Sequence, residues 1–87
     1  MIFEFDENKS ASNEVKHGIS FEEAKKFWND VNALKLEAIE RNEIRYLLIA
    51  MLYDKHWSAI YTYRGENIRI ISVRRSRKNE VLFYESN

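Results

Sequence analysis

The stretch RGENIRIISVRRSRK, residues 64–78, contains a turn, a strand and a dense run of basic side chains in direct succession. Gly65 supplies the flexible residue that a tight hairpin turn needs. The β-branched residues that follow it, Ile68, Ile70, Ile71 and Val73, are typical of strands. Residues 68–74 are therefore predicted to form a strand, and the part of the chain that precedes it is expected to support this strand.

Regular alternation along this strand would divide its arginines between two faces. Ile68, Ile70, Ser72 and Arg74 would share one face, and Arg69, Ile71, Val73 and Arg75 the other. A guanidinium group presents a planar fork of donors that fits phosphate or carboxylate. The stretch is thus either an anion-binding site or a solvated edge of the sheet.

Composition restricts the class of protein. A chain of 87 residues with 45% hydrophobic and 14% aromatic residues is expected to fold as one domain, residues 1–87. The absence of cysteine excludes disulfides, thiolate zinc sites and cysteine nucleophiles. No run approaches the roughly 18 apolar residues of a membrane span, and the acidic start does not resemble a signal peptide. We therefore expect a cytoplasmic protein without a membrane partner.

The net charge of zero hides an uneven distribution. Residues 64–87 contain six Lys and Arg against three Asp and Glu, so that this part carries +3 and residues 1–63 carry −3. Such a division allows the C-terminal part to meet a polyanion and another surface to meet a different partner, although a merely solvated surface would show the same pattern.

The N-terminal part is predicted to contain a short strand at residues 2–5 and two helices. Asp6 can cap a helix over residues 7–17, and Gly18 can end it in the left-handed conformation. Ala11 and Val15 form its only apolar stripe, so this helix must depend on tertiary contacts.

The second helix has the stronger sequence signal. Ser20 and Glu23 have the spacing of a capping box, which predicts that the helix begins there. The apolar residues after them recur at helical intervals and predict a stripe that faces the core: Ala24, Phe27, Trp28 and Val31.

The remaining chain alternates like a series of strands. We predict strands at residues 33–39, 44–53 and 57–64, the second being central and covered on both faces. Trp57, Ala59, Tyr61 and Tyr63 should share one face of the third. A last helix at residues 79–84 could dock Val81, Leu82 and Tyr84 on the sheet. The predicted class is therefore α+β, with helices gathered against an antiparallel sheet.

Several segments, taken in order, resemble a known family. They are FEFDENK at 3–9, Asn13, KHGISFEEA at 16–24, Glu43-x-Arg45, RIISVRR at 69–75, Glu80 and Tyr84. Together they closely resemble BrnT, the toxin of BrnT/BrnA toxin–antitoxin systems, over nearly the whole chain. Departures from the family pattern are Phe5, where tryptophan is common, Ala50, where glycine is common, and Val73, where alanine is usual.

This resemblance implies a small ribonuclease with a RelE-like fold, in which N-terminal helices pack on the sheet and a short helix ends the chain. It also implies neutralisation by a BrnA-like ribbon-helix-helix antitoxin, which carries the DNA-binding activity, so that the toxin meets DNA only indirectly. No cofactor is implied. Two histidines 39 positions apart, without carboxylates at ligand spacing, also argue against a metal site.

RNA carries its own nucleophile, the 2′-hydroxyl, so a metal-free ribonuclease needs a base, an acid and cations that stabilise the phosphorane. We expect Arg74 and Arg69 to stabilise the phosphate with help from Lys16, Glu43 and His17 to be the acid–base pair, and Arg45 to orient a group or contact phosphate. Further RNA contacts are predicted for Arg64, Arg75, Arg77 and Lys78.

Alternatives stay open for several of these residues. Because Arg69 and Arg74 lie on opposite faces of an ideal strand, either a bulge turns one of them or only one serves the site. His17 precedes Gly18 and could simply stabilise a helix end. Glu43 and Arg45 could pair only with each other. The whole chain could also be a binding module for antitoxin or nucleic acid that has no catalytic activity.

Overall fold

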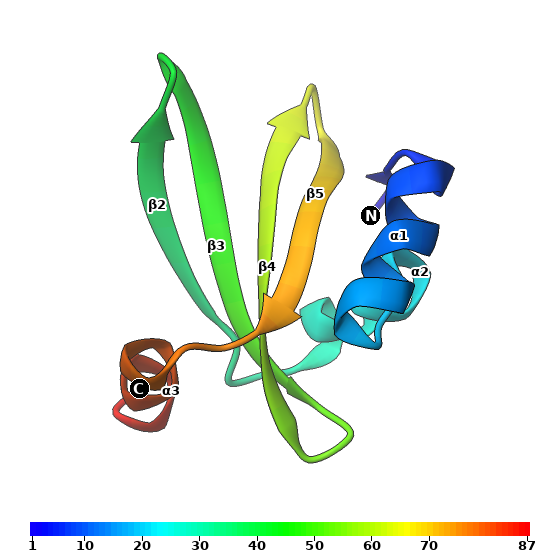
Figure 1. Ribbon diagram of the computed structural model, residues 1–87. Helices are drawn as coiled ribbons and strands as arrows, with labels where there is room; N and C mark the ends of the chain where they lie inside the picture. Colours follow the sequence, from blue (N-terminus) through cyan, green and yellow to red (C-terminus); the bar gives the residue numbers. More distant parts are fainter.

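One sheet of five strands organises the chain, and the computed structural model describes residues 1–87 (Figure 1). The strands are β1 (Phe3–Glu4), β2 (Leu34–Glu40), β3 (Glu43–Leu52), β4 (Lys55–Arg64) and β5 (Asn67–Arg75). Their order across the sheet is β1-β5-β4-β3-β2. Strands β2 to β5 form an antiparallel meander, but β1 runs parallel to β5. The α+β class is confirmed, whereas the prediction of a purely antiparallel sheet is wrong.

The helices are α1 (Glu7–His17), α2 (Phe21–Ala24) and α3 (Lys78–Glu85), and a 3₁₀ helix, η1 (Lys25–Asn29), continues α2. The predicted ends of α1 are confirmed, because Asp6 Oδ1 accepts the N–H of Asn8 at 2.8 Å and Gly18 has a φ of 81°. The capping box of Ser20 and Glu23 is also present. No helix is long and apolar enough to cross a membrane.

The core lies between α2, η1 and one face of the sheet, which we call the helix face; Trp57, Ala59 and Tyr61 mark it on β4. Phe21, Ala24 and Phe27 of the helical segment are at most 1% exposed. The opposite side of the sheet, marked on β4 by Ser58, Ile60 and Thr62, is called the open face.

The predicted apolar stripe of the second helix extends beyond the residues that face the core. Val31 is 95% exposed, because the chain tightens into η1 at Lys25 and the helical turns end at Asn29. Only Ala24, Phe27 and Trp28 therefore face the core. The prediction for residues 44–53 also holds only in part: Leu48, Ile49 and Ala50 are buried, but Ile44 is 49% exposed, and β4 is the middle strand.

Helix α1 is held against α2 and β5 by polar side chains and not by its apolar stripe. Ala11 and Val15 are exposed, whereas Ser10 and Asn13 are buried. Ser10 Oγ accepts the N–H of Phe21 at 2.9 Å. Asn13 donates from Nδ2 to the carbonyl of Ile19 at 2.9 Å and accepts the N–H of Val73 at 3.3 Å. One amide group thus joins α1 to both the start of α2 and the outer edge of β5.

Asn13→Ala is expected to destabilise the fold by about 1–3 kcal/mol, because it leaves a buried carbonyl and a buried N–H without partners. Urea unfolding of the purified protein measures this loss. Ser12→Ala, a change at the exposed neighbouring position, serves as the control and should shift stability by less than about 0.5 kcal/mol. Equal stability of the two variants would contradict a bridging role for Asn13.

Helix α3 lies apart from α1 and α2, near the lower ends of the strands in Figure 1. The prediction that Leu82 docks on the sheet is wrong, since Leu82 is 62% exposed. The helix is held instead by Glu80, which is 6% exposed, and by Tyr84, whose hydroxyl donates to Asp30 Oδ2 at 2.8 Å. Buried polar contacts therefore fix the position of this helix.

Candidate active site

A β-bulge in β5 decides which arginines share a face. Ile60 of β4 pairs with Ser72, but the next residue, Tyr61, pairs with Ile70, so that Ile71 is an extra residue in β5. An extra residue reverses the alternation of the side chains beyond it. Arg69 and Arg74 therefore lie on the same face of the sheet, which removes the conflict predicted for an ideal strand.

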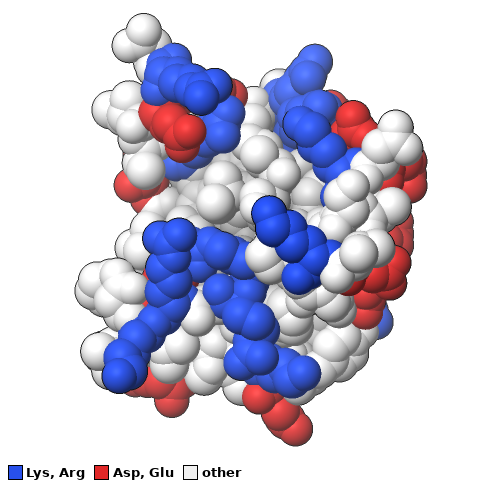
Figure 2. Space-filling view, viewed as in Figure 1, with Lys and Arg blue, Asp and Glu red and all other residues white.

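This shared face is the open face. Arg69 lies opposite Thr62 and Arg74 lies opposite Ser58. In the view of Figure 2, Lys and Arg side chains surround an uncharged area over the middle of the sheet. Thr62 and Ser58 are four positions apart on β4, so the two arginines leave the sheet about 13 Å apart along the strands. The open face thus has an upper and a lower cationic region.

The lower region contains Arg74, which forms a two-pronged salt bridge with Glu80 of α3. Its Nη1 and Nη2 donate to the two carboxylate oxygens at 2.8 and 2.9 Å. Nη1 also donates to the carbonyl of Arg75. A guanidinium has five N–H donors, so two remain without a protein partner. Arg74 can therefore still bind an anion while it holds α3.

Glu80 collects four donors and is almost completely buried. Besides Arg74, it accepts the hydroxyl of Ser58 at 2.9 Å and the N–H of Arg77 at 2.8 Å. These bonds stabilise the carboxylate and lower the pKa of Glu80 to about 2, with the bond from Arg74 as the largest cause. The same bond raises the pKa of Arg74.

The lowered pKa of Glu80 predicts a loss of stability in acid. An unfolded glutamate titrates near about pH 4.3. The contribution of Glu80 is therefore complete above about pH 5 and disappears as the pH falls towards 2, a difference of up to about 3 kcal/mol. Unfolding free energies measured from pH 7 to pH 2.5 should show the gap between wild type and Glu80→Gln closing over this range. Glu37→Gln, at an exposed position, is the control, and a gap that does not depend on pH would contradict the assignment.

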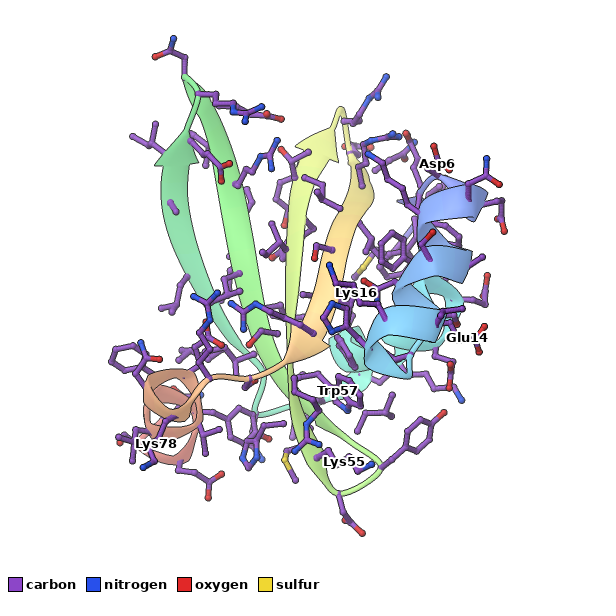
Figure 3. The ribbon with its side chains drawn as sticks, in the orientation of Figure 1. Asp6, Glu14, Lys16, Lys55, Trp57 and Lys78 are labelled. Carbon is purple, nitrogen blue, oxygen red and sulfur yellow. The ribbon has the colours of Figure 1, made fainter.

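Lys16 and His17 lie beside the lower region because α1 runs along β5 in the same direction. The N-terminal part of the chain contacts β5 at two points. Phe3 pairs with Ile68, and Asn13, further along the chain, bonds to Val73, further along β5. Ser10, Asn13 and His17 share one face of α1, since they are three and four residues apart. Figure 3 shows Lys16 extending from α1 towards β5. Neither Lys16 nor His17 has a side-chain hydrogen bond or ion pair.

The upper region contains Arg69 and Arg45, each beside carboxylates. Arg69 Nη1 lies 3.8 Å from Glu4 Oε1. Arg45 Nη2 lies 3.5 Å from Glu43 Oε2 and Nη1 lies 3.9 Å from Glu40 Oε1. The expected pairing of Glu43 with Arg45 is therefore present. These distances are longer than those of strong charged hydrogen bonds.

The structure does not bring Glu43 and His17 together. His17 follows Asn13 by one helical turn, and Asn13 is bonded to Val73, which is aligned through Ala59 with Leu48. Glu43 lies five residues further along β3, about 17 Å away along the sheet and two strands across. A direct proton exchange between these two side chains on one phosphate is thus not supported by their positions.

The other predicted RNA contacts fall into two groups. Arg64, Arg77 and Lys78 are exposed at the upper hairpin and at the start of α3. Arg75 lies on the helix face, with its guanidinium 5.5 Å from the ring of Trp57 and its Nε bonded to the carbonyl of His56. Ordinary alternation places Arg75 on the face opposite Arg74, and the bulge also separates it from Arg69.

Comparison with known proteins identifies the family of this chain. Residues 5–80 match the family described as "Ribonuclease toxin, BrnT, of type II toxin-antitoxin system". The chain belongs to the BrnT toxin family. A search of curated proteins found no match. Membership of the BrnT family supports a ribonuclease toxin with an RNA substrate and an antitoxin partner. No three His, Asp or Glu side chains gather where they could hold a metal ion.

Sequence reasoning missed two residues that position the site of this BrnT protein. Glu80 has no predicted role beyond the resemblance, although its spacing of three from Arg77 is typical of a contact at a helix N-terminus. Asn13 also belongs to the segments that carry the resemblance, but beyond that it is only a polar residue in a polar helix. Both residues act through partners distant in sequence, Ser58 and Val73, which a local pattern does not specify.

Proposed function

We propose that this BrnT toxin is an endoribonuclease that cuts RNA through attack of the substrate's own 2′-hydroxyl and needs no metal ion. The observation that carries the proposal is the bulge at Ile71, because it places Arg69 on the open face together with Arg74, the arginine that lies nearer to Lys16 and His17. Cations that are fixed before the substrate arrives stabilise the charge of a phosphorane without reorganisation.

In the proposed reaction, His17 takes the proton of the 2′-hydroxyl, whose oxygen attacks the adjacent phosphorus. The bond from phosphorus to the 5′-oxygen breaks and a 2′,3′-cyclic phosphate forms. Lys16, the neighbour of His17, gives a proton to the departing 5′-oxygen, and the two free N–H donors of Arg74 hold the phosphate oxygens. Glu43 keeps Arg45 oriented rather than acting as the acid.

Cations around this centre would hold the rest of the RNA. Arg69 and Arg45 lie on the same face, and Arg64, Arg77 and Lys78 are exposed at its borders. Arg75 would contact RNA only where the strand passes the edge of β5, since its side chain lies on Trp57. Each contact between a cationic side chain and a phosphate adds affinity for RNA, and this affinity falls as the salt concentration rises.

Family membership also supports three finer proposals. The arrangement of helices is RelE-like, the protein acts in the cytoplasm, and its partner is a BrnA-like ribbon-helix-helix antitoxin that makes the DNA contacts of the complex. Purification of the toxin with a tagged antitoxin of that type, followed by DNA binding with and without the toxin, tests the last point.

The test of the reaction uses purified protein, a long RNA and excess chelator. We expect cutting to persist and to leave 2′,3′-cyclic phosphate ends. His17→Ala should remove the cutting, whereas His56→Ala, which changes the only other histidine, should keep it. Chelator-sensitive cutting that leaves 3′-hydroxyl and 5′-phosphate ends would contradict the mechanism, because a metal-activated water would then be the nucleophile.

A second candidate function is binding without cleavage. Arg45, Arg69 and Arg74 each already have a carboxylate neighbour, as expected for cations whose role is to hold a surface in shape. RNA that is retarded in a gel but stays intact, together with normal growth when the toxin is induced alone in a bacterial host, would favour this reading over the ribonuclease.

A further inference from the structure

The upper part of the open face contains a small pocket of about 190 Å³. Ala38, Glu40, Arg45, Tyr46, Leu47 and Ile60 line it. Pockets that enclose drug-sized molecules measure roughly 300–1,000 Å³. This pocket is therefore suited to one flat aromatic base and not to a whole nucleotide.

The walls of the pocket are apolar where a ring would lie. Leu47 of β3 and Ile60 of β4 are directly paired and half-buried. Ala38 of β2 is paired with Arg45 and leaves room above the strand because its side chain is a single methyl group. The face of a nucleobase could rest on these side chains, while its edge would meet the polar end of the pocket.

Arg45 supplies the polar end and is incompletely bonded. Its Nε is the one buried side-chain nitrogen or oxygen in the protein without a hydrogen-bond partner. Buried donors are nearly always paired, so an unpaired one requires a physical explanation. The two ion pairs of Arg45, at 3.5 and 3.9 Å, are long. The Nη1 and Nη2 groups of this guanidinium can therefore bond to an acceptor that a ligand brings into the pocket.

The pocket offers the guanidinium donors of Arg45 together with the carboxylate acceptor of Glu40. Guanine matches this set, because its edge carries the acceptor O6 beside the donors N1–H and N2–H₂. Adenine lacks the oxygen, and uracil and cytosine lack two adjacent donors. Arginine is also the side chain that most often contacts guanine specifically.

We infer that this pocket binds a single guanine base of the RNA substrate, with Arg45 bonded to O6 and Glu40 to the N1–H and N2–H₂ donors. The inference rests on the proposed RNA substrate and adds the base that the toxin selects. Arg45 and Arg69 lie on the same level of the sheet on either side of Thr62, so Arg69 would hold a phosphate beside the selected base. The cut would then fall at a fixed offset from a guanine.

Binding of short 2′-deoxy oligonucleotides, which lack the nucleophile, tests the pocket separately from cleavage. Fluorescence anisotropy would compare otherwise identical sequences that carry one guanine, inosine, adenine or uracil. We expect guanine to bind about tenfold more tightly than adenine or uracil. Inosine should lie between, because it lacks the amino group that would donate a hydrogen bond to Glu40.

Variants with matched controls complete the test. Glu40→Gln and Arg45→Lys should remove most of the preference for guanine. Glu37→Gln, on the helix face of the same strand, and Arg41→Lys, in the exposed hairpin turn, should keep it. Thermal melts would confirm that each variant is folded. Equal binding of all four bases, or a guanine preference that survives in both pocket variants, would overturn the inference.

The outcome is distinguishable from that of the proposed ribonuclease. Guanine-selective binding by a protein that never cuts RNA would support the pocket and overturn the proposed cleavage. Cutting without any guanine at a fixed offset, together with equal binding of the four bases, would support cleavage and overturn the pocket.

Discussion

Arg74→Ala is expected to lower RNA cleavage by about 10²-fold or more, the scale for removing one preorganised donor from a transition-state oxyanion. The same change should reduce stability by about 3–5 kcal/mol, because it leaves the buried carboxylate of Glu80 without its cation. Both Nη groups of Arg74 bond to this carboxylate, so the loss of the side chain affects the fold as well as the reaction. Cleavage rates must therefore be measured well below the melting temperature of the variant.

A second variant separates catalysis from structure. In Arg74→Ala combined with Glu80→Gln, no buried charge remains unpaired, so part of the lost stability should return while cleavage stays low. Arg74→Lys keeps the charge but loses the planar fork, so it should restore little activity. Lys35→Ala, which removes a cation from the opposite face of the sheet, is the control. Recovery of cleavage in the double variant would show that Arg74 only holds α3.

Phe27→Ala should have the largest effect on stability alone, about 3–5 kcal/mol. Phe27 is completely buried and stacks on Trp57 with ring centroids 6.4 Å apart, so its removal leaves a cavity between η1 and the sheet. Urea unfolding measures the change. Val31→Ala, at a position that is 95% exposed, should alter stability by less than about 0.5 kcal/mol. Similar losses in the two variants would contradict the boundary of the core described above.

Local signals in the sequence predicted the helix ends and turns correctly. Asp6, Gly18 and the Ser20–Glu23 box act on backbone groups within a few residues, so the sequence around them contains the whole interaction. Gly65 likewise has the positive φ that a tight turn requires. The end of the core-facing stripe was missed at Val31, because an apolar residue at helical spacing does not show where the helix tightens and stops.

The face of the sheet on which each arginine lies could not be predicted from the sequence of β5 alone. Whether Arg69 and Arg74 share a face follows from the pairing of Ile70 and Ser72 with Tyr61 and Ile60 of β4. Periodicity within β5 alone gives the opposite answer. The candidate residues were therefore proposed from their chemical types and from the resemblance, whereas their grouping into lower and upper regions required the structure.

The parallel pairing of β1 with β5 has a consequence for the time course of folding. Phe3 and Ile68 are neighbours in the sheet although 65 positions separate them in the chain. Contacts between such distant residues form slowly, because the entropy of closing a long loop is lost before any contact compensates for it. The hairpins of β2 to β5 involve nearby residues and can form first. We therefore expect Lys16 and His17, the proposed catalytic residues of α1, to reach β5 late, after the arginines of the sheet are in place.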